Sequence, residues 1–193
     1  MSLNILLISD TMIKERTAVH GNIDPKLIYP DIKVAQDMYI LPILGTALYD
    51  KLQSIINDGT ITTNPVNINY KNLIDKFLVD ALIYYTLSEL PTTISYQFWN
   101  KGIVRKQGDN TELPSMSELI DISNKYKNRA EFYANRLSKW IIQNANTMFP
   151  EYLRPGNGID TINPTDRPFT TGIYLGDNGD CCFDWGLRLP YSE

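Results

Sequence analysis

PDIKVAQDMYILPILGTALYDKLQSIINDG, residues 30–59, is the stretch of the chain that decides its fold. Apolar residues recur at helical spacing on both sides of Pro42, which predicts two helices hinged at that proline. Pro30 suits a helix start. Pro42 lacks the N–H that a helix interior needs, so we expect the first helix to end or kink just before it. Gly45 has no side chain, which lets another backbone approach the hinge closely. The pattern is typical of packing and shows no evident chemical role.

The composition is that of a folded chain with an uneven distribution of charge. At 193 residues and 43% hydrophobic content, one domain with an appendage is expected. The net charge is -4, yet residues 1–146 carry 15 basic and 15 acidic residues, whereas residues 147–193 carry 3 and 7. A balanced body lacks the clustered basic excess that a dedicated nucleic-acid surface needs.

The cysteines and the apolar runs bear on the expected compartment. Cys181 and Cys182 are adjacent, and adjacent cysteines rarely form a disulfide because the ring is strained, so a reducing compartment fits best. The apolar start LNILLIS is too short for a signal peptide and has no basic flank. No run approaches the roughly 18 to 20 apolar residues of a membrane span. We expect a soluble, intracellular chain with no membrane partner.

Further helices are predicted from periodicity and from signals at their ends. Ser9 is a candidate N-cap, and Ser115 with Glu118 forms a capping box. Pro91 is expected to end the helix of residues 70–90. These helices cover residues 11–16, residues 70–90, and the long run from the capping box to Asn146, with a polar linker at residues 60–69. The sequence therefore predicts an all-α fold, a bundle of four to five helices.

The composition changes at Thr147. Residues 147–193 hold five of the 11 prolines, six of the 11 glycines and seven aromatics, and helical periodicity stops. We predict two parts, a helical domain of residues 1–146 and an irregular, partly extended C-terminal arm of residues 147–193, with a possible strand at residues 169–175. Exposed aromatics often anchor interfaces, so we expect the arm to become ordered on a neighbouring subunit. Its interface candidates are Tyr174, Phe183 and Trp185.

A second group of interface candidates lies in the predicted loop of residues 92–113. Trp99 precedes Lys101, Arg105 and Lys106. Aromatic and basic side chains together can stack on bases and bind phosphates. The same pattern also suits a loop that its aromatics fix to the core while its cations stay in water. Both interpretations remain open from the sequence.

Residue patterns that carry catalysis or bind metals are missing from the sequence. His20 is the sole histidine and stands in a turn signal without a neighbouring acid and nucleophile. Asp75 and Asp80 are five residues apart, about 140° around a helix, so they do not share a face. The aspartates at positions 177, 180 and 184 lack the ligand spacing of an EF-hand, and the cysteine pair lacks CxxC spacing. We predict no catalytic, cofactor-binding or metal-binding residue.

The central stretch also carries a resemblance to a known family. A helix ending in AQ-x-x-(Y)I and the following LPILGTALYDKL resemble the core motif of head–tail connector proteins of tailed phages, also called adaptor or head-completion proteins. The spacing from Asp24 through Gln36 to Gly45 and Tyr49 is the specific part. It is most similar to the versions in phages of Bacteroidetes-type hosts, including the neck ring proteins of crAss-like phages, and it covers roughly residues 1–150.

This resemblance implies a structural virion protein and no enzyme. Such a protein forms a ring, a dodecamer in the family, between portal and tail, and leaves a channel through which DNA passes without sequence-specific binding. The implied partners are the portal protein, neighbouring copies, and tail or further neck proteins. The implied location is the virion neck, after synthesis in the host bacterial cytoplasm. Alternatives are a tail-completion or terminator protein, a small metal-dependent hydrolase, and a monomeric binding module.

Overall fold

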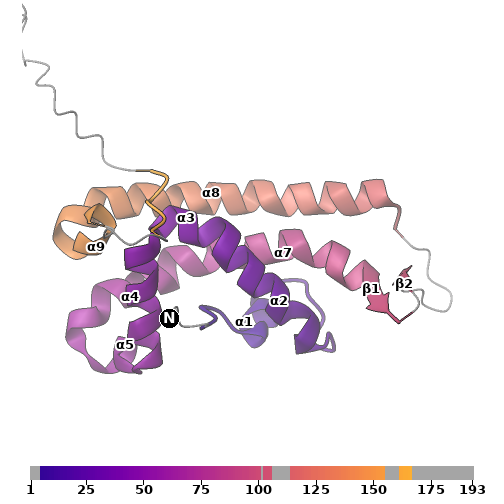
Figure 1. The fold of residues 1–193 in the computed structure, drawn as a ribbon, viewed down its shortest axis with the longest axis horizontal. Helices are drawn as coiled ribbons and strands as arrows, with labels where there is room; N and C mark the ends of the chain where they lie inside the picture. Colours follow the sequence, from indigo (N-terminus) through magenta and orange to yellow (C-terminus); the bar gives the residue numbers. More distant parts are fainter. Residues whose placement is uncertain (1–4, 101, 106–113, 155–160, 167–193) are drawn as a thin grey trace, which may run out of the picture.

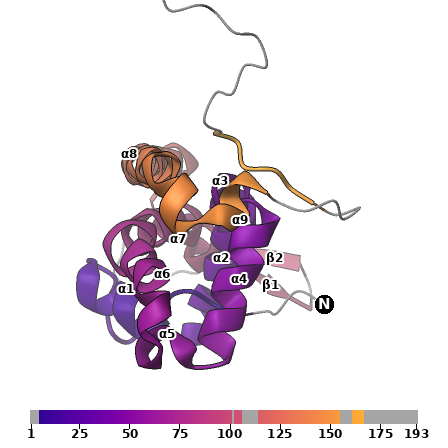
Figure 2. The same cartoon turned by 90° about the vertical axis from the view of Figure 1, so that its left-hand side faces the viewer.

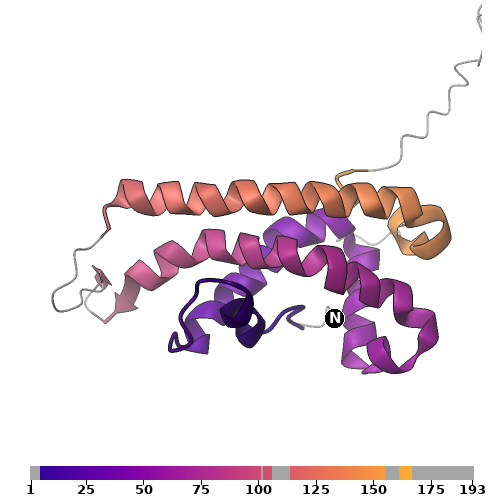
Figure 3. The ribbon, with the colours of Figure 1, turned by 180° about the vertical axis from the view of Figure 1, so that it is seen from behind.

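A computed structural model of the protein describes residues 5–100, 102–105, 114–154 and 161–166. These residues form a helical bundle with one short β-hairpin, which confirms the predicted all-α class. Helix α8 (Met116–Met148) runs along the whole body, with α7 (Val79–Ser95) beneath it (Figure 1). The view from behind shows the same two helices side by side (Figure 3). In the end view, α4 lies beside this pair (Figure 2).

The other elements are short helices, helical turns and two strands. In chain order they are α1 (Asp10–Arg16), α2 (Pro25–Ala35), the π-helical turn η1 (Gln36–Ile40), α3 (Leu41–Leu44), α4 (Thr46–Asn57), α5 (Thr60–Thr63), the 3-10 turn η2 (Pro65–Asn67), α6 (Ile68–Leu73), the π-helical turn η3 (Ile74–Leu78), β1 (Tyr96–Trp99), β2 (Gly102–Arg105) and α9 (Pro150–Leu153).

The helix of the central stretch starts earlier and ends later than predicted. It begins at Pro25 after the N-cap Asp24, so Pro30 lies inside it. It also continues through Pro42 without ending there. The π-helical turn η1 precedes that proline, and the Leu41 N–H bonds back to the Gln36 carbonyl. A π turn rearranges the hydrogen-bond ladder where proline offers no donor.

The chain turns at Gly45, three residues after the predicted hinge. Gly45 has φ 75 and ψ 157, a combination that only glycine adopts readily, and it separates α3 from α4. Its close neighbour is Pro164 of the C-terminal segment, not a helix. The expected close approach is therefore present, but a different element makes it.

Two predicted boundaries of the helix expected at residues 70–90 are also wrong. Residues 60–69 were predicted to be linker, but they form α5, η2 and the start of α6. Pro91 does not end the helix, because α7 continues to Ser95. One physical reason is tertiary: the Thr93 hydroxyl donates to Oδ1 of buried Asp31 at 2.9 Å, which ties the last turn of α7 to α2.

The predicted helix ends at Ser9 and Ser115 are confirmed. Ser9 caps α1 through a hydrogen bond from the Met12 N–H. Ser115 and Glu118 form the reciprocal capping box of α8. The face of α8 that meets the core consists of small and aliphatic residues, all buried: Ala130, Ala134, Leu137, Ile141 and Ala145. These small and aliphatic residues let α8 lie close along α7.

Gln36 joins the N-terminal segment to the central helices. Its side chain is fully buried. Oε1 accepts from the Leu7 N–H at 3.0 Å, while Nε2 donates to the Ile5 carbonyl at 2.9 Å and to the Tyr49 hydroxyl. Tyr49 in turn donates to Asp37. Both Gln36 and Tyr49 belong to the motif that carries the family resemblance, and here they have a structural role.

The helical body extends past the boundary predicted at residue 147. Phe149 is fully buried and Tyr152 is almost fully buried, so the start of the C-terminal arm belongs to the core. The Phe149 ring meets Tyr70 edge-on with centroids 5.5 Å apart. Further on, the Thr46 N–H donates to the Ile162 carbonyl at 3.0 Å, which fixes residues 161–166 against α4. An arm that orders only on a neighbour must therefore begin after these residues.

Candidate interaction surface

Two of the predicted interface residues lie at the β-hairpin. Trp99 is the last residue of β1 and Arg105 is the last residue of β2. The strands are antiparallel, with Trp99 opposite Gly102 and Tyr96 opposite Arg105. Trp99 and Arg105 therefore lie at opposite ends of the hairpin, and the register does not make them neighbours.

The remaining candidates lie outside the described residues. These are Lys101, Lys106, Tyr174, Phe183 and Trp185. The possible strand at residues 169–175, the aspartates at positions 177, 180 and 184, and the cysteine pair also lie outside them. The interface role predicted for these residues stays a prediction.

The histidine and the two helical aspartates that were considered as catalytic or metal-binding residues lie in a turn, an ion pair and an exposed position. His20 begins a turn in which its Nδ1 accepts from the Asn22 N–H at 3.2 Å. Asp80 pairs with Arg16 at 3.5 Å, and Asp75 is exposed. Within the described part of the chain, no group of three or more His, Cys, Asp or Glu side chains is placed to hold a metal ion.

A groove with only positive charges lies along one side of α8. We call it the cationic groove; its volume is about 560 Å³, and it is lined by Phe77, Phe132, Asn135, Arg136, Lys139, Trp140 and Gln143. The Arg136 guanidinium lies 4.9 Å from the centre of the Phe77 ring, which itself stacks on Trp140 at 4.5 Å. The Phe132 side chain is 66% exposed. The groove thus offers aromatic surface beside two cations.

A second groove lies on another side of α8 and has only negative charges. We call it the acidic groove; it is lined by Met38, Tyr39, Pro42, Ile43, Tyr85, Glu131, Ala134, Asn135, Ser138, Thr165 and Asp166. Met38 at its edge is 60% exposed. Its acidic side chains, Glu131 and Asp166, are both exposed. Asn135 lines both grooves, so a single helix separates two surfaces of opposite charge.

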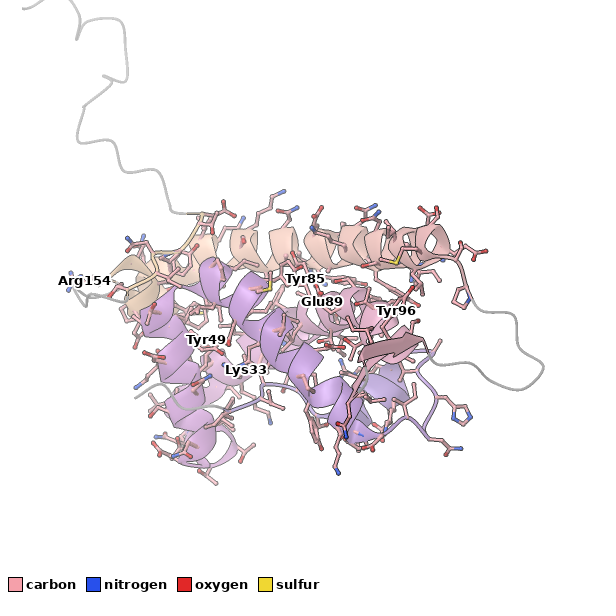
Figure 4. The ribbon with its side chains drawn as sticks, turned by 45° about the vertical axis from the view of Figure 1, so that its right-hand side comes forward. Lys33, Tyr49, Tyr85, Glu89, Tyr96 and Arg154 are labelled. Atoms are coloured by element: carbon pink, nitrogen blue, oxygen red, sulfur yellow. The ribbon has the colours of Figure 1, made fainter. Side chains whose placement is uncertain are left out.

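Two of the residues that line the acidic groove, Tyr39 and Tyr85, form a stacked aromatic pair. The Tyr39 and Tyr85 rings stack with centroids 4.2 Å apart and planes 3° from parallel. Tyr39 donates to Glu89 at 2.8 Å, and burial together with that carboxylate raises the pKa of Tyr39 to about 12. Burial and the charge of Glu131 raise the pKa of Tyr85. Both phenols therefore stay neutral near pH 7. Tyr85 and Glu89 come from α7, in the middle of the body (Figure 4).

The spacing of residues along α8 carries a local signal for the cationic groove. Arg136 and Lys139 stand three residues apart, and Phe132 precedes Arg136 by four, so all three share one face of a helix. The acidic groove had no such signal. Its walls come from η1, α3, α7, α8 and residues 165–166, which only the tertiary fold brings together.

Among the residues that the structure describes, none forms a helix both long and apolar enough to cross a bilayer.

The fold and its surfaces define an all-α bundle with grooves of opposite charge on its longest helix. The chain belongs to a family of unknown function, DUF6712, whose family model matches residues 40–162. The match runs from the end of η1 through α8 to Ile162, the residue that bonds to Thr46. Neither the comparison with curated proteins nor that with solved structures returned a match.

Proposed function

We propose that the protein is a structural virion protein that forms a ring between portal and tail in a tailed phage. In this role it joins the capsid to the tail and leaves a channel for DNA. Its partners are copies of itself, the portal protein, and tail or other neck proteins. It carries out no catalysis in this role. The motif from Gln36 to Tyr49, which resembles that of head–tail connector proteins, supports the proposal.

The observation that best supports a ring is the pair of oppositely charged grooves on α8. A ring needs a heterologous contact, in which one surface of each subunit meets a different surface of the next. The acidic groove, with Glu131 and Asp166, and the cationic groove, with Arg136 and Lys139, are two such unlike surfaces. Complementary charge favours the correct pairing and disfavours contact between two identical surfaces.

The assembly state in solution tests the proposal. We expect native mass spectrometry of the purified chain, with and without portal protein, to show a closed oligomer of one fixed size. Arg136→Glu with Lys139→Glu places like charges at the contact and should reduce the oligomer by at least about tenfold. Glu131→Lys with Asp166→Lys should restore it in that background.

A matched control separates the contact from net charge. Lys26→Glu with Lys51→Glu makes the same change in charge at exposed positions on α2 and α4, outside both grooves. This variant should assemble like the parent protein. A protein that stays monomeric at every concentration, with and without the portal protein, would instead indicate a monomeric binding module.

A further inference from the structure

The cationic groove has two charges without a carboxylate partner among the described residues. The ion pairs found in that part of the chain join Lys14 to Asp10, Arg16 to Asp80 and Lys33 to Asp37, all away from α8. Lys125 and Arg129 continue the face of Arg136 and Lys139 toward the start of α8, at four- and three-residue spacing around exposed Phe132. The face is therefore a row of four cations with an aromatic ring between them.

One segment of the chain has the complementary chemistry. Residues 177–185, DNGDCCFDW, contain three aspartates, two aromatic rings and no lysine or arginine. Across the first 146 residues, in contrast, acidic and basic residues balance. Carboxylates bind guanidinium and ammonium groups through charge-assisted hydrogen bonds, and aromatic rings bind other rings and cations.

The chain leaves the described body close to this groove. Thr165 is fixed because its N–H and its hydroxyl both donate to the Pro42 carbonyl, at 2.9 and 3.0 Å. Asp166 lines the acidic groove beside Asn135, and Asn135 also lines the cationic groove. The eleven steps from residue 166 to residue 177 span up to about 36–40 Å, whereas a helix with its side chains is about 10–12 Å across. This length of chain is enough to cross α8.

We propose that residues 177–185 bind the cationic groove of their own chain. Asp180 and Asp184 bind Arg136 and Lys139, and the rings of Phe183 and Trp185 cover Phe132. The short tether gives the segment an effective concentration in the millimolar range, so its own groove is occupied before that of another copy. This docking does not depend on the proposed ring. Its consequence, that an incoming neighbour must displace the segment, rests on the proposed function.

Photocrosslinking in the full-length chain tests the docking. Benzoylphenylalanine at position 132 should crosslink to the peptide that contains Phe183 and Trp185. The control places it at Ile120, which is 47% exposed on the same helix but outside the groove. A mixture of isotope-labelled and unlabelled protein shows whether a crosslink lies within one chain or between two. We expect it within one chain, with a lower yield in 1 M salt, where charges are screened within about 3 Å.

Charge reversal and charge swapping complete the test. Arg136→Glu with Lys139→Glu should lower the crosslink yield by about tenfold, and Asp180→Lys with Asp184→Lys should restore it in that background. Circular dichroism of each variant checks that the helices are retained. The proposal is overturned if no crosslink forms, or if crosslinks join only different chains. It is also overturned if Arg136→Glu with Lys139→Glu leaves the crosslink yield at the parent level.

Native mass spectrometry of the same samples separates this proposal from the proposed function. A crosslink within one chain, in a protein that never forms an oligomer, supports the docking and contradicts the ring. An oligomer of fixed size, whose dissociated monomers at low protein concentration also lack that crosslink, supports the ring and contradicts the docking.

Discussion

Pro164 lies directly over Gly45. A Cβ atom added at Gly45 would lie 2.7 Å from both Cγ and Cδ of Pro164 and 3.2 Å from its nitrogen. This contact joins the turn between α3 and α4 to the C-terminal segment. The Thr46 hydrogen bond to Ile162 and the Thr165 hydrogen bonds to Pro42 flank it on both sides. The absence of a side chain at residue 45 is therefore what lets the C-terminal segment close over the turn.

We predict that Gly45→Ala lowers the free energy of unfolding by about 2–5 kcal/mol. Part of the loss is backbone strain at φ 75 and ψ 157, and part is the clash with Pro164. Urea unfolding measures the loss. The control Gly59→Ala has φ 65 and ψ 10 with nothing within 4 Å of the added Cβ, so it should cost only about 1–2 kcal/mol.

The same experiment isolates the contact with Pro164. In the Gly45→Ala background, Pro164→Ala removes the Cγ and Cδ atoms that would clash, so it should recover part of the loss. Equal losses for Gly45→Ala and Gly59→Ala, with no recovery in the double variant, would show that the C-terminal segment does not cover the turn.

Gln36→Leu should lower the free energy of unfolding by about 2–4 kcal/mol. The change leaves the Leu7 N–H and the Ile5 carbonyl without their partner, and each unsatisfied buried group costs about 1–3 kcal/mol. The control is Gln143→Leu, the same substitution at an exposed position of α8. Similar urea midpoints for the two variants would show that the N-terminal segment does not depend on Gln36.

Phe149→Ala should cost about 3–5 kcal/mol, the usual loss for a fully buried phenylalanine. Leu153→Ala is the control in the adjacent helix α9, because Leu153 is 37% exposed and should cost far less. Thermal unfolding compares the two. If Phe149→Ala melts like Leu153→Ala, the helical domain does end near residue 146, and the buried position of Phe149 is wrong.

Asp31 should make the protein less stable as the pH rises. Burial raises its pKa above the ordinary 3.8; the hydrogen bond from Thr93 lowers it, and the charge of Glu89 raises it. The folded state therefore binds the Asp31 proton more tightly than the unfolded state. The stability that this proton gives is fully present below pH 3.8 and is lost as the pH rises through the raised pKa.

Asp31→Asn measures this effect, because asparagine keeps the shape and an oxygen that can accept from Thr93 but carries no charge. We expect the free energy of unfolding of Asp31→Asn, relative to the parent protein, to increase between pH 3.5 and pH 7 in urea titrations. Asp75→Asn, at an exposed position, should show no such trend. A constant difference across this range would show that Asp31 is not desolvated.

Local signals in the sequence predict the capped starts of α1 and α8 and the buried face of α8. The capping box at Ser115 is contained within four residues, and the buried face of α8, which includes Leu137 and Ile141, follows from helical spacing. The prolines were misjudged because tertiary contacts decide their effect. The bond between Thr93 and Asp31 holds α7 together beyond Pro91, and the π turn before Pro42 lets that helix continue.

The two grooves also differ in how far the sequence alone can predict them. Phe132, Arg136 and Lys139 share a helix face that spacing can reveal. The acidic groove combines residues from α3 with Thr165 and Asp166, more than 120 residues later in the chain. No pattern within one segment reports such a contact. The close approach expected at Gly45 is present, but the sequence did not predict which element makes it. A glycine indicates that there is room for a neighbour, whereas only the tertiary fold brings Pro164 to that place.

Electron microscopy of the purified chain mixed with portal protein tests the central proposal most directly. We expect class averages in which a closed ring with an open central channel lies against one end of the portal. The Arg136→Glu and Lys139→Glu variant should leave most portal particles without that ring. Bare portal particles with the parent protein, together with a monomeric chain at every concentration, would contradict the proposal.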